Sequence, residues 1–299
     1  MKLFTTIAVE ISSACNRRCK FCPVSVAKRK DELMSPNVFS AVVNNLADLK
    51  YKGRIELYIY NEPMKHRNHL EACVARFKKA VPGATLMVST NGDYMKTYRD
   101  LIWLYEIGVR QVVLNAYTAR RYPVFKDWED EIQSEGSVKW TDNVYSKIPK
   151  NQFGLKVYDK SDPDEFGGGV FALQNRAGAI PDFLPATTQP VKRMCVKPFR
   201  MLNINWNGQA MICCNDYYGD VPAGQVPQET LQEIWFGKVF TLYRRKLLNK
   251  DRSLPLCRTC DCHSGAYPAN VGEPDANSPE ADESALEIVY KQQLQRRSL

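Results

Sequence analysis

The stretch TTIAVEISSACNRRCKFCP, residues 5–23, decides how the rest of the chain is interpreted. Residues 5–11 alternate in the manner of a β-strand. They run directly into three cysteines, Cys15, Cys19 and Cys22, at spacings of four and then three residues. The sequence therefore predicts a loop of three thiols just beyond the carboxyl end of its first strand.

Strands and helices alternate through the first half of the chain. A cap followed by a proline, Ser35 and Pro36, opens a helix with an apolar stripe. Two further helices are centred on Leu70–Phe77 and Leu101–Tyr105, and strands are expected at residues 55–60, 84–89 and 111–115. This rhythm predicts a parallel sheet, open or barrel-like, with its chemistry at the carboxyl ends of the strands.

The second half is less regular. Residues 121–170 show no clean period, so we expect irregular structure with a late strand or two. Residues 227–248 predict one helix, residues 264–280 a loop rich in Gly, Pro, Asn, Asp and Ser, and the chain ends in an amphipathic helix around Leu286–Leu294.

Composition limits the classes of protein to consider. With 299 residues, 44% of them hydrophobic and 25% charged, the chain has an ordinary globular composition. No apolar run is long enough to cross a bilayer, and the N-terminus is too short and polar for a secretory signal, so we expect a cytoplasmic protein. The net charge is +8, but no basic motif interleaved with aromatic residues is present, which argues against nucleic-acid binding.

Ten cysteines in a cytoplasmic chain favour metal or redox chemistry over disulfides. Buried packing is a poor explanation for the first three, because Asn16, Arg17, Arg18 and Lys20 are interleaved with them. Thiolates hold iron–sulfur clusters, and three ligands on four irons leave one iron open to a substrate or cofactor.

The loop CNRRCKFC resembles the Cys-x3-Cys-x2-Cys loop of radical SAM enzymes, including the aromatic Phe21 before the third cysteine. YNEP (60–63) is similar to the family's Gly-Gly-Glu-Pro motif, although Tyr60 and Asn61 replace the two glycines, and STNG (89–92) resembles its ribose- and carboxylate-binding segment. The resemblance implies a partial (β/α)6-type barrel that binds S-adenosyl-L-methionine. It also implies cofactor contacts from Phe21, Tyr60, Asn61, Glu62, Pro63, Ser89, Thr90, Asn91 and Asn115.

A second group of cysteines can complete a four-thiolate site: Cys195, Cys213, Cys257 and Cys260. Structural zinc is the competing interpretation. The group resembles the twitch module, a shortened SPASM domain with an auxiliary cluster, which makes two [4Fe–4S] clusters in all. We expect three parts: a radical SAM barrel at 1–190, an auxiliary-cluster module at 191–263, and a loop with a C-terminal helix at 264–299.

NRAG (175–178) resembles a segment of family members that oxidise aminocyclitols, which implies that Arg176 lies near the reacting hydroxyl. The expected reaction is oxidation of a secondary alcohol on a small, hydrophilic sugar, aminocyclitol or related natural-product intermediate. A flavodoxin- or ferredoxin-type protein would supply the electron that starts the reaction.

Two other outcomes stay open. An epimerase needs a free thiol as hydrogen-atom donor, and Cys214 or Cys262 could serve. Peptide modification is the third option. It is disfavoured because a strand begins by residue 5, which leaves no room before it for a peptide-recognition domain.

Overall fold

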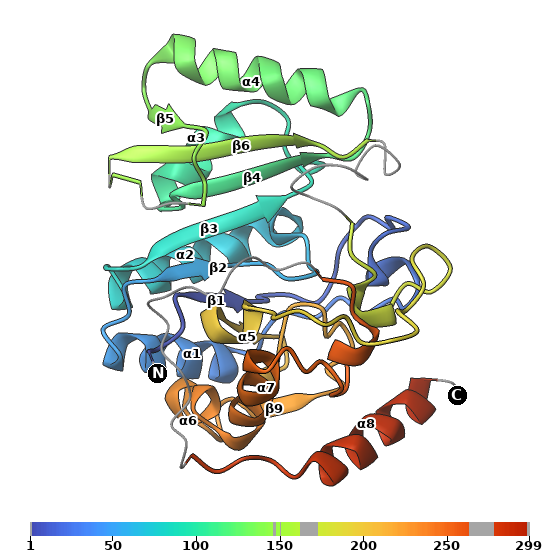
Figure 1. The fold of residues 1–299 in the computed structure, drawn as a ribbon. Coiled ribbons are helices and arrows are strands. Elements are labelled where there is room, and N and C mark those ends of the chain that lie inside the picture. The colour runs from blue at the N-terminus through green and yellow to red at the C-terminus, as the bar shows by residue number, and fades with distance from the viewer. Residues whose placement is uncertain (1, 146–147, 150, 162–172, 263–277, 298–299) are drawn as a thin grey trace.

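A computed structural model describes residues 2–145, 148–149, 151–161, 173–262 and 278–297. Its centre is a nine-stranded sheet in the order β5-β6-β4-β3-β2-β1-β7-β8-β9 (Figure 1). All pairs from β5 to β7 are parallel, and β8 and β9 add antiparallel pairs at one edge. The strands are β1 (Thr6–Val9), β2 (Arg54–Glu56), β3 (Thr85–Thr90), β4 (Gln111–Ala116), β5 (Lys139–Thr141), β6 (Gln152–Asp159), β7 (Met201–Ile204), β8 (Gln209–Met211) and β9 (Pro222–Gln225).

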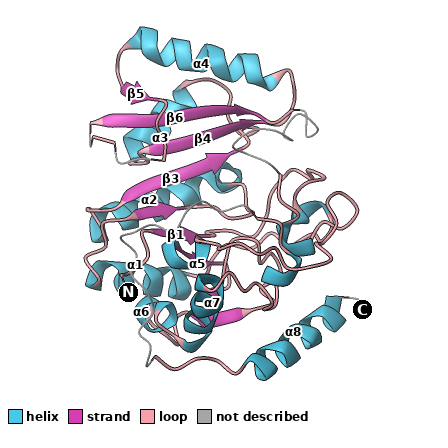
Figure 2. Cartoon of the chain, viewed as in Figure 1, coloured by secondary structure: helices cyan, strands magenta, loops and turns pink. Residues whose placement is uncertain are grey.

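Helices follow each of the first four strands and cover the sheet (Figure 2). The α-helices are α1 (Pro36–Asp48), α2 (Arg67–Ala80), α3 (Arg99–Ile107), α4 (Arg121–Glu135), α5 (Lys197–Arg200), α6 (Leu231–Trp235), α7 (Lys238–Leu248) and α8 (Glu283–Arg297). Short 3-10 helices are η1 (Pro23–Ser25), η2 (Pro63–His66), η4 (Arg176–Gly178) and η5 (Cys257–Thr259). Among the described helices, none has the length and apolar character needed to cross a membrane.

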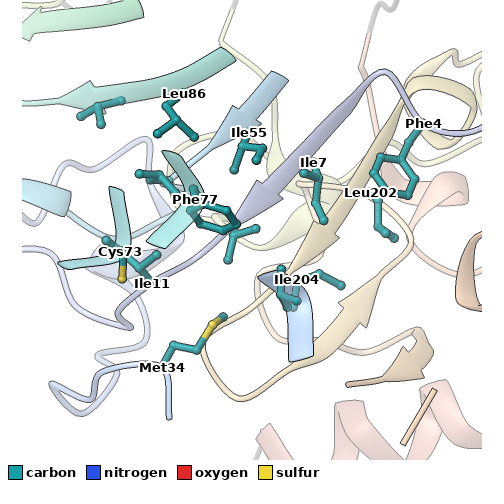
Figure 3. Close-up of a cluster of buried hydrophobic side chains, with 14 of the residues drawn as sticks. Phe4, Ile7, Ile11, Met34, Ile55, Cys73, Phe77, Leu86, Leu202 and Ile204 are labelled. Atoms are coloured by element: carbon teal, nitrogen blue, oxygen red, sulfur yellow. The ribbon is translucent and has the colours of Figure 1, made fainter. Parts of the chain in front are cut away.

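The hydrophobic core lies between the sheet and these helices. Ile7 of β1, Leu202 of β7 and Phe77 of α2 all point into it (Figure 3). In register, Ile7 pairs with Leu202 on one side and with Ile55 on the other. Because side chains alternate along a strand, the neighbours of these residues face the opposite side of the sheet.

The sequence predicted the start of α1 correctly. The Ser35 side chain accepts a hydrogen bond from the Val38 amide, and Pro36 occupies the first turn. Both features satisfy the unpaired groups of a helix N-terminus. The expected strands and helices up to residue 116 are also present, with bounds shifted by a few residues.

The prediction of irregular structure from residue 121 was wrong for α4. Phe125, Trp128 and Ile132 are buried at helical spacing, and Gly136 ends the helix in the left-handed conformation. Pro123 lies in the first turn, where a proline is tolerated. The late strands anticipated in this region are β5 and β6.

The single helix expected at 227–248 is two helices, α6 and α7, separated at Phe236 and Gly237. Gly237 has extended backbone angles and forms the N-terminal cap of α7. The final helix is present as α8, which joins the body through an ion pair between Glu287 and Arg258. The loop expected at 264–280 lies almost entirely outside the described residues.

Candidate functional site

A cavity of about 290 Å³ opens at the carboxyl ends of the parallel strands. The three cysteines of the 15–22 loop line it, together with eight of the nine expected cofactor-binding residues: Phe21, Tyr60, Asn61, Glu62, Ser89, Thr90, Asn91 and Asn115. The ninth, Pro63, is buried behind the wall, where it begins η2. Arg176 and Cys214 also line this cavity, so segments far apart in the sequence meet there.

Hydrogen bonds fix the cysteine loop against the end of β3. Arg17 Nε lies 2.7 Å from an Asp93 oxygen, and Asn16 Nδ2 lies 2.6 Å from the same oxygen. Asn91 Nδ2 donates to Asn16 Oδ1 at 2.8 Å. The segment TNGD, residues 90–93, therefore anchors the cysteine loop and also forms part of the cavity wall.

The thiols of this loop fit a cluster that replaces their protons. Burial raises the pKa of Cys15 and of Cys19 to about 11, and it raises that of Cys22 as well. Thiols with such pKa values stay protonated at neutral pH unless a metal displaces the proton. All three reach one cavity that is large enough to admit a further molecule beside them.

Glu62 is one of two buried acids that line this cavity, the other being Glu56. Its carboxylate accepts hydrogen bonds from Thr90 Oγ1 at 2.5 Å, from the Asn91 amide at 2.8 Å and from the Met64 amide at 3.0 Å. Burial nevertheless raises its pKa to about 7. A buried carboxylate so poised suits a cationic ammonium group.

Arg176 reaches the cavity from a strained turn. Arg176 and Ala177 have φ angles of 50° and 55°, in the left-handed region that non-glycine residues rarely adopt. Asn175 holds the turn, since its Nδ2 donates to Thr259 O at 2.8 Å. The buried Nε of Arg176 has no hydrogen-bond partner among the residues that the structure describes. This turn therefore places the Arg176 guanidinium at the cavity, with its Nε unpaired among the described residues.

A second, much smaller cavity of about 20 Å³ lies in the C-terminal region. The four predicted auxiliary ligands line it: Cys195, Cys213, Cys257 and Cys260. Cys262 also lines it, and its side chain hydrogen-bonds to Cys260, which lowers the pKa of Cys260 to about 6. Five thiols around one small space have the donor chemistry that an iron–sulfur cluster requires.

A site for a single metal ion would need at least three ligating side chains close together. Among the residues that the structure describes, no three His, Cys, Asp or Glu side chains are grouped as a single-ion metal site.

The two candidate hydrogen-atom donors lie in different places. Cys214 lines the large cavity, and its backbone oxygen accepts a hydrogen bond of 2.7 Å from the Tyr60 hydroxyl. Cys262 lines the small cavity and is almost fully buried there. Of these two cysteines, Cys214 is thus the one that lines the same cavity as Arg176.

Several residues of the large cavity were not named from the sequence: Glu56, Tyr58, Tyr117, Lys160, Met201 and Asn203. Tyr117 and Lys160 each follow the end of a parallel strand, and that position could have indicated them. Asn203 is a polar residue among the apolar residues of β7, MLNI, and that contrast could have indicated it.

Comparisons with known proteins agree with this geometry. Residues 195–261 match the SPASM iron–sulfur cluster-binding domain. Over 262 residues the chain is 27% identical to the S-adenosyl-L-methionine-dependent 2-deoxy-scyllo-inosamine dehydrogenase of Niallia circulans, covering 87% of this chain and 94% of that protein. The chain resembles a radical SAM dehydrogenase.

Solved structures extend this radical SAM resemblance to the fold. The crystal structure of BtrN in complex with AdoMet and 2-DOIA matches with a TM-score of 0.68 at 26% identity, over 87% of this chain and 94% of that one. AnSMEcpe with bound AdoMet matches with a TM-score of 0.52, over 99% and 94% of the two chains. At 12% identity, that second likeness concerns the fold alone. The expected α/β fold and the resemblance to radical SAM enzymes with a SPASM-type domain are confirmed.

Proposed function

We propose that this protein is a radical SAM oxidoreductase that converts a secondary alcohol of a small polyhydroxylated molecule to a ketone. The main support is that the three-cysteine loop, Glu62 and Arg176 share one cavity, while Cys213, next to Cys214 in the sequence, lines a second, cysteine-lined cavity. The similarity to an aminocyclitol dehydrogenase over 87% of the chain supports the same reaction class.

When bound, S-adenosylmethionine and a cluster on Cys15, Cys19 and Cys22 supply a radical that takes the carbinol hydrogen, and an auxiliary cluster supplies an acceptor for the remaining electron. Glu62 would hold the amino group of S-adenosylmethionine. Of the two buried carboxylates that line the cavity, Glu56 pairs with Arg54, whereas the hydrogen bonds to Glu62 come from neutral groups. Ser89, Asn91 and Asn115 offer hydrogen-bonding groups for its ribose and carboxylate.

Loss of the carbinol hydrogen leaves a radical that must still release the hydroxyl proton and one electron to become a ketone. Arg176 would hydrogen-bond the substrate oxygen as negative charge develops on it. Arginine itself is a poor base. Lys160 in the same cavity is better suited, because burial lowers its pKa to about 8; a fraction of it is then neutral near neutral pH, and that neutral Nζ would receive the proton.

Anaerobic reconstitution tests the cluster assignment. We expect about eight irons per chain, in two four-iron clusters. Cys15→Ala and Cys257→Ala should each lose roughly half of this iron. A count of about four irons with one zinc would remove the electron acceptor, and with it the proposed oxidation.

Turnover with 2-deoxy-scyllo-inosamine tests the reaction. We expect a ketone and one 5′-deoxyadenosine per ketone formed. Epimerisation is a second candidate, favoured by the Cys214 thiol in the large cavity. Turnover in D2O separates the two, because an epimerase would return deuterium from the exchanged thiol to an unoxidised carbon.

A further inference from the structure

Asn203 is a buried side chain without a hydrogen-bond partner among the described residues. It lies on β7, is 1% exposed, and lines the large cavity. Within the part of the chain that the structure describes, neither its Oδ1 nor its Nδ2 has a hydrogen-bond partner. A buried carboxamide normally pairs both atoms, because leaving them unpaired costs free energy.

The strand geometry aims this side chain at the cavity. Leu202 and Ile204, on either side of it, point into the hydrophobic core (Figure 3). By alternation Asn203 faces the other side of the sheet, as does Ala8, its register partner on β1. Ala8 and Asn203 both line the cavity. The small Ala8 side chain leaves space beside the carboxamide.

The neighbouring acid of the cavity is already paired. Glu56 Oε1 accepts a hydrogen bond of 2.8 Å from Arg54 Nε, and the Tyr58 side chain also hydrogen-bonds to Glu56. These groups satisfy one another. Among the described residues, Asn203 thus keeps an unpaired donor nitrogen and an unpaired acceptor oxygen, side by side, on the cavity wall.

Asn205 provides the contrast two residues further along. It is also buried, but its Oδ1 accepts from the Gln209 amide at 2.9 Å and its Nδ2 donates to Gln209 Oε1 at 3.3 Å. That asparagine has an evident structural task in the turn before β8. Asn203 has none among the described residues.

We infer that Asn203 is a substrate-binding residue that pairs its carboxamide with a hydroxyl or amino group of a polyhydroxylated ring. A hydroxyl group both donates and accepts, so one hydroxyl or two adjacent ones can satisfy both atoms of the amide. This inference rests on the proposed function, since it names the group that reads the substrate in that cavity. It adds a contact on β7, a different segment from those that carry Arg176 and the cysteine loop.

The test uses the reconstituted protein with S-adenosylmethionine, and two probes, 2-deoxy-scyllo-inosamine and scyllo-inositol. Binding is followed as the rise in melting temperature that each probe causes. We expect at least one probe to stabilise the wild type. Asn203→Leu should weaken that binding by about tenfold to a hundredfold, the loss expected for two hydrogen bonds.

Stability without a probe gives an independent readout. Asn203→Leu should melt at or above the wild-type temperature, because it removes two unpaired polar atoms from a buried position. Asn205→Leu is the matched control. It should melt below the wild type, because it breaks the bonds to Gln209, and it should keep the wild-type response to the probe.

Three outcomes would overturn the inference. The inference is wrong if neither probe binds the wild type, if Asn203→Leu responds to the probe like the wild type, or if Asn203→Leu melts well below the wild type. An unchanged response to the probe would mean that only solvent hydrogen-bonds to the amide. A large loss of melting temperature would mean that the protein itself hydrogen-bonds to it. Failure of the proposed function looks different: the probe binds and depends on Asn203, but no ketone forms.

Discussion

The Nζ atom of Lys197 donates a hydrogen bond to the Sγ atom of Cys214 at 3.4 Å. Lys197 lines the small cysteine cavity, whereas Cys214 lines the large one, so this contact joins the two sites. Burial by itself would lower the pKa of Lys197, but the sulfur atoms of Cys214, Cys262 and Cys213 raise it overall. A partly buried positive charge therefore lies between the proposed substrate site and the proposed auxiliary cluster.

Lys197→Met should make the auxiliary cluster harder to reduce. A nearby positive charge favours the reduced, more negative cluster, and its loss should lower the reduction potential by on the order of 100 mV. Redox titration followed by electron paramagnetic resonance measures this shift. Lys197→Arg keeps the charge and should change the potential much less. Equal potentials in Lys197→Met and the wild type would show that this ammonium does not act on the cluster.

Cys214 and Cys262 should respond differently to replacement. Cys262→Ala should disturb the auxiliary cluster and change its spectrum, because Cys262 hydrogen-bonds to Cys260 and Cys195. Cys214→Ala should retain wild-type iron content and still oxidise a substrate. If Cys214→Ala instead forms radicals but yields no product in either H2O or D2O, the epimerase interpretation gains and the dehydrogenase interpretation loses.

Binding of S-adenosylmethionine should weaken as the pH falls through about 7. Burial raises the pKa of Glu62 from 4.5 to about 7, and only the carboxylate attracts an ammonium group. Affinity should drop roughly tenfold for each pH unit below 7. Calorimetric titration between pH 6 and 8 measures the slope, and Glu62→Gln should bind weakly with no such slope.

The same carboxyl group contributes to stability with the opposite sign. Because its pKa is higher in the folded protein than the ordinary 4.5, its protonated form favours folding. Its contribution is complete below about pH 4.5 and is lost as the pH rises through about 7. Melting curves of Glu62→Gln and the wild type, without ligand, should therefore differ in their pH dependence across this range.

Arg29 should be a strong contributor to stability. Its guanidinium lies 2.9 Å from Glu10, whose side chain is fully buried, and it packs over the Tyr217 ring at 4.0 Å. Arg29→Met leaves a buried carboxylate without its cation, which should lower the free energy of unfolding by about 3–5 kcal/mol. Denaturant titration measures this.

The matched control is Arg99, whose side chain is 71% exposed and whose ion pair to Glu135 spans 3.8 Å. Arg99→Met should cost less than about 1 kcal/mol. Similar losses in the two variants would mean that burial of the Arg29–Glu10 pair adds nothing.

The sequence predicted most of the first half of the fold because periodicity and caps agree there. Ser35 and Pro36 mark the start of α1 as clearly in the sequence as in the structure. Helix α4 was missed because its charged residues and Pro123 obscured the spacing of Phe125, Trp128 and Ile132. The break at Gly237 was missed because both helices keep their apolar residues on the same core, so the period continues across it.

For the candidate site, short motifs were more informative than patterns. The residues of the cysteine loop, YNEP and STNG gather around one cavity because they follow neighbouring parallel strands. Asn203 and Lys160 belong to no motif. In three dimensions, Asn203 is distinguished by its unpaired carboxamide among the described residues, and Lys160 by its place in the cavity and its lowered pKa. Cys214 and Cys262 line different cavities, and their positions in the sequence could not predict this.

Strand β1 lies between β2 and β7, and Thr6 pairs with both Arg54 and Met201. On a ribosome, the first of these partners follows soon after β1, but the second emerges only after roughly 200 further residues, some 10–40 s later at ordinary rates of synthesis. During that time one edge of β1 has no partner and is open to pairing with other chains. Completion of the sheet must then wait for the C-terminal region, so the nascent chain depends on protection that the finished protein does not need.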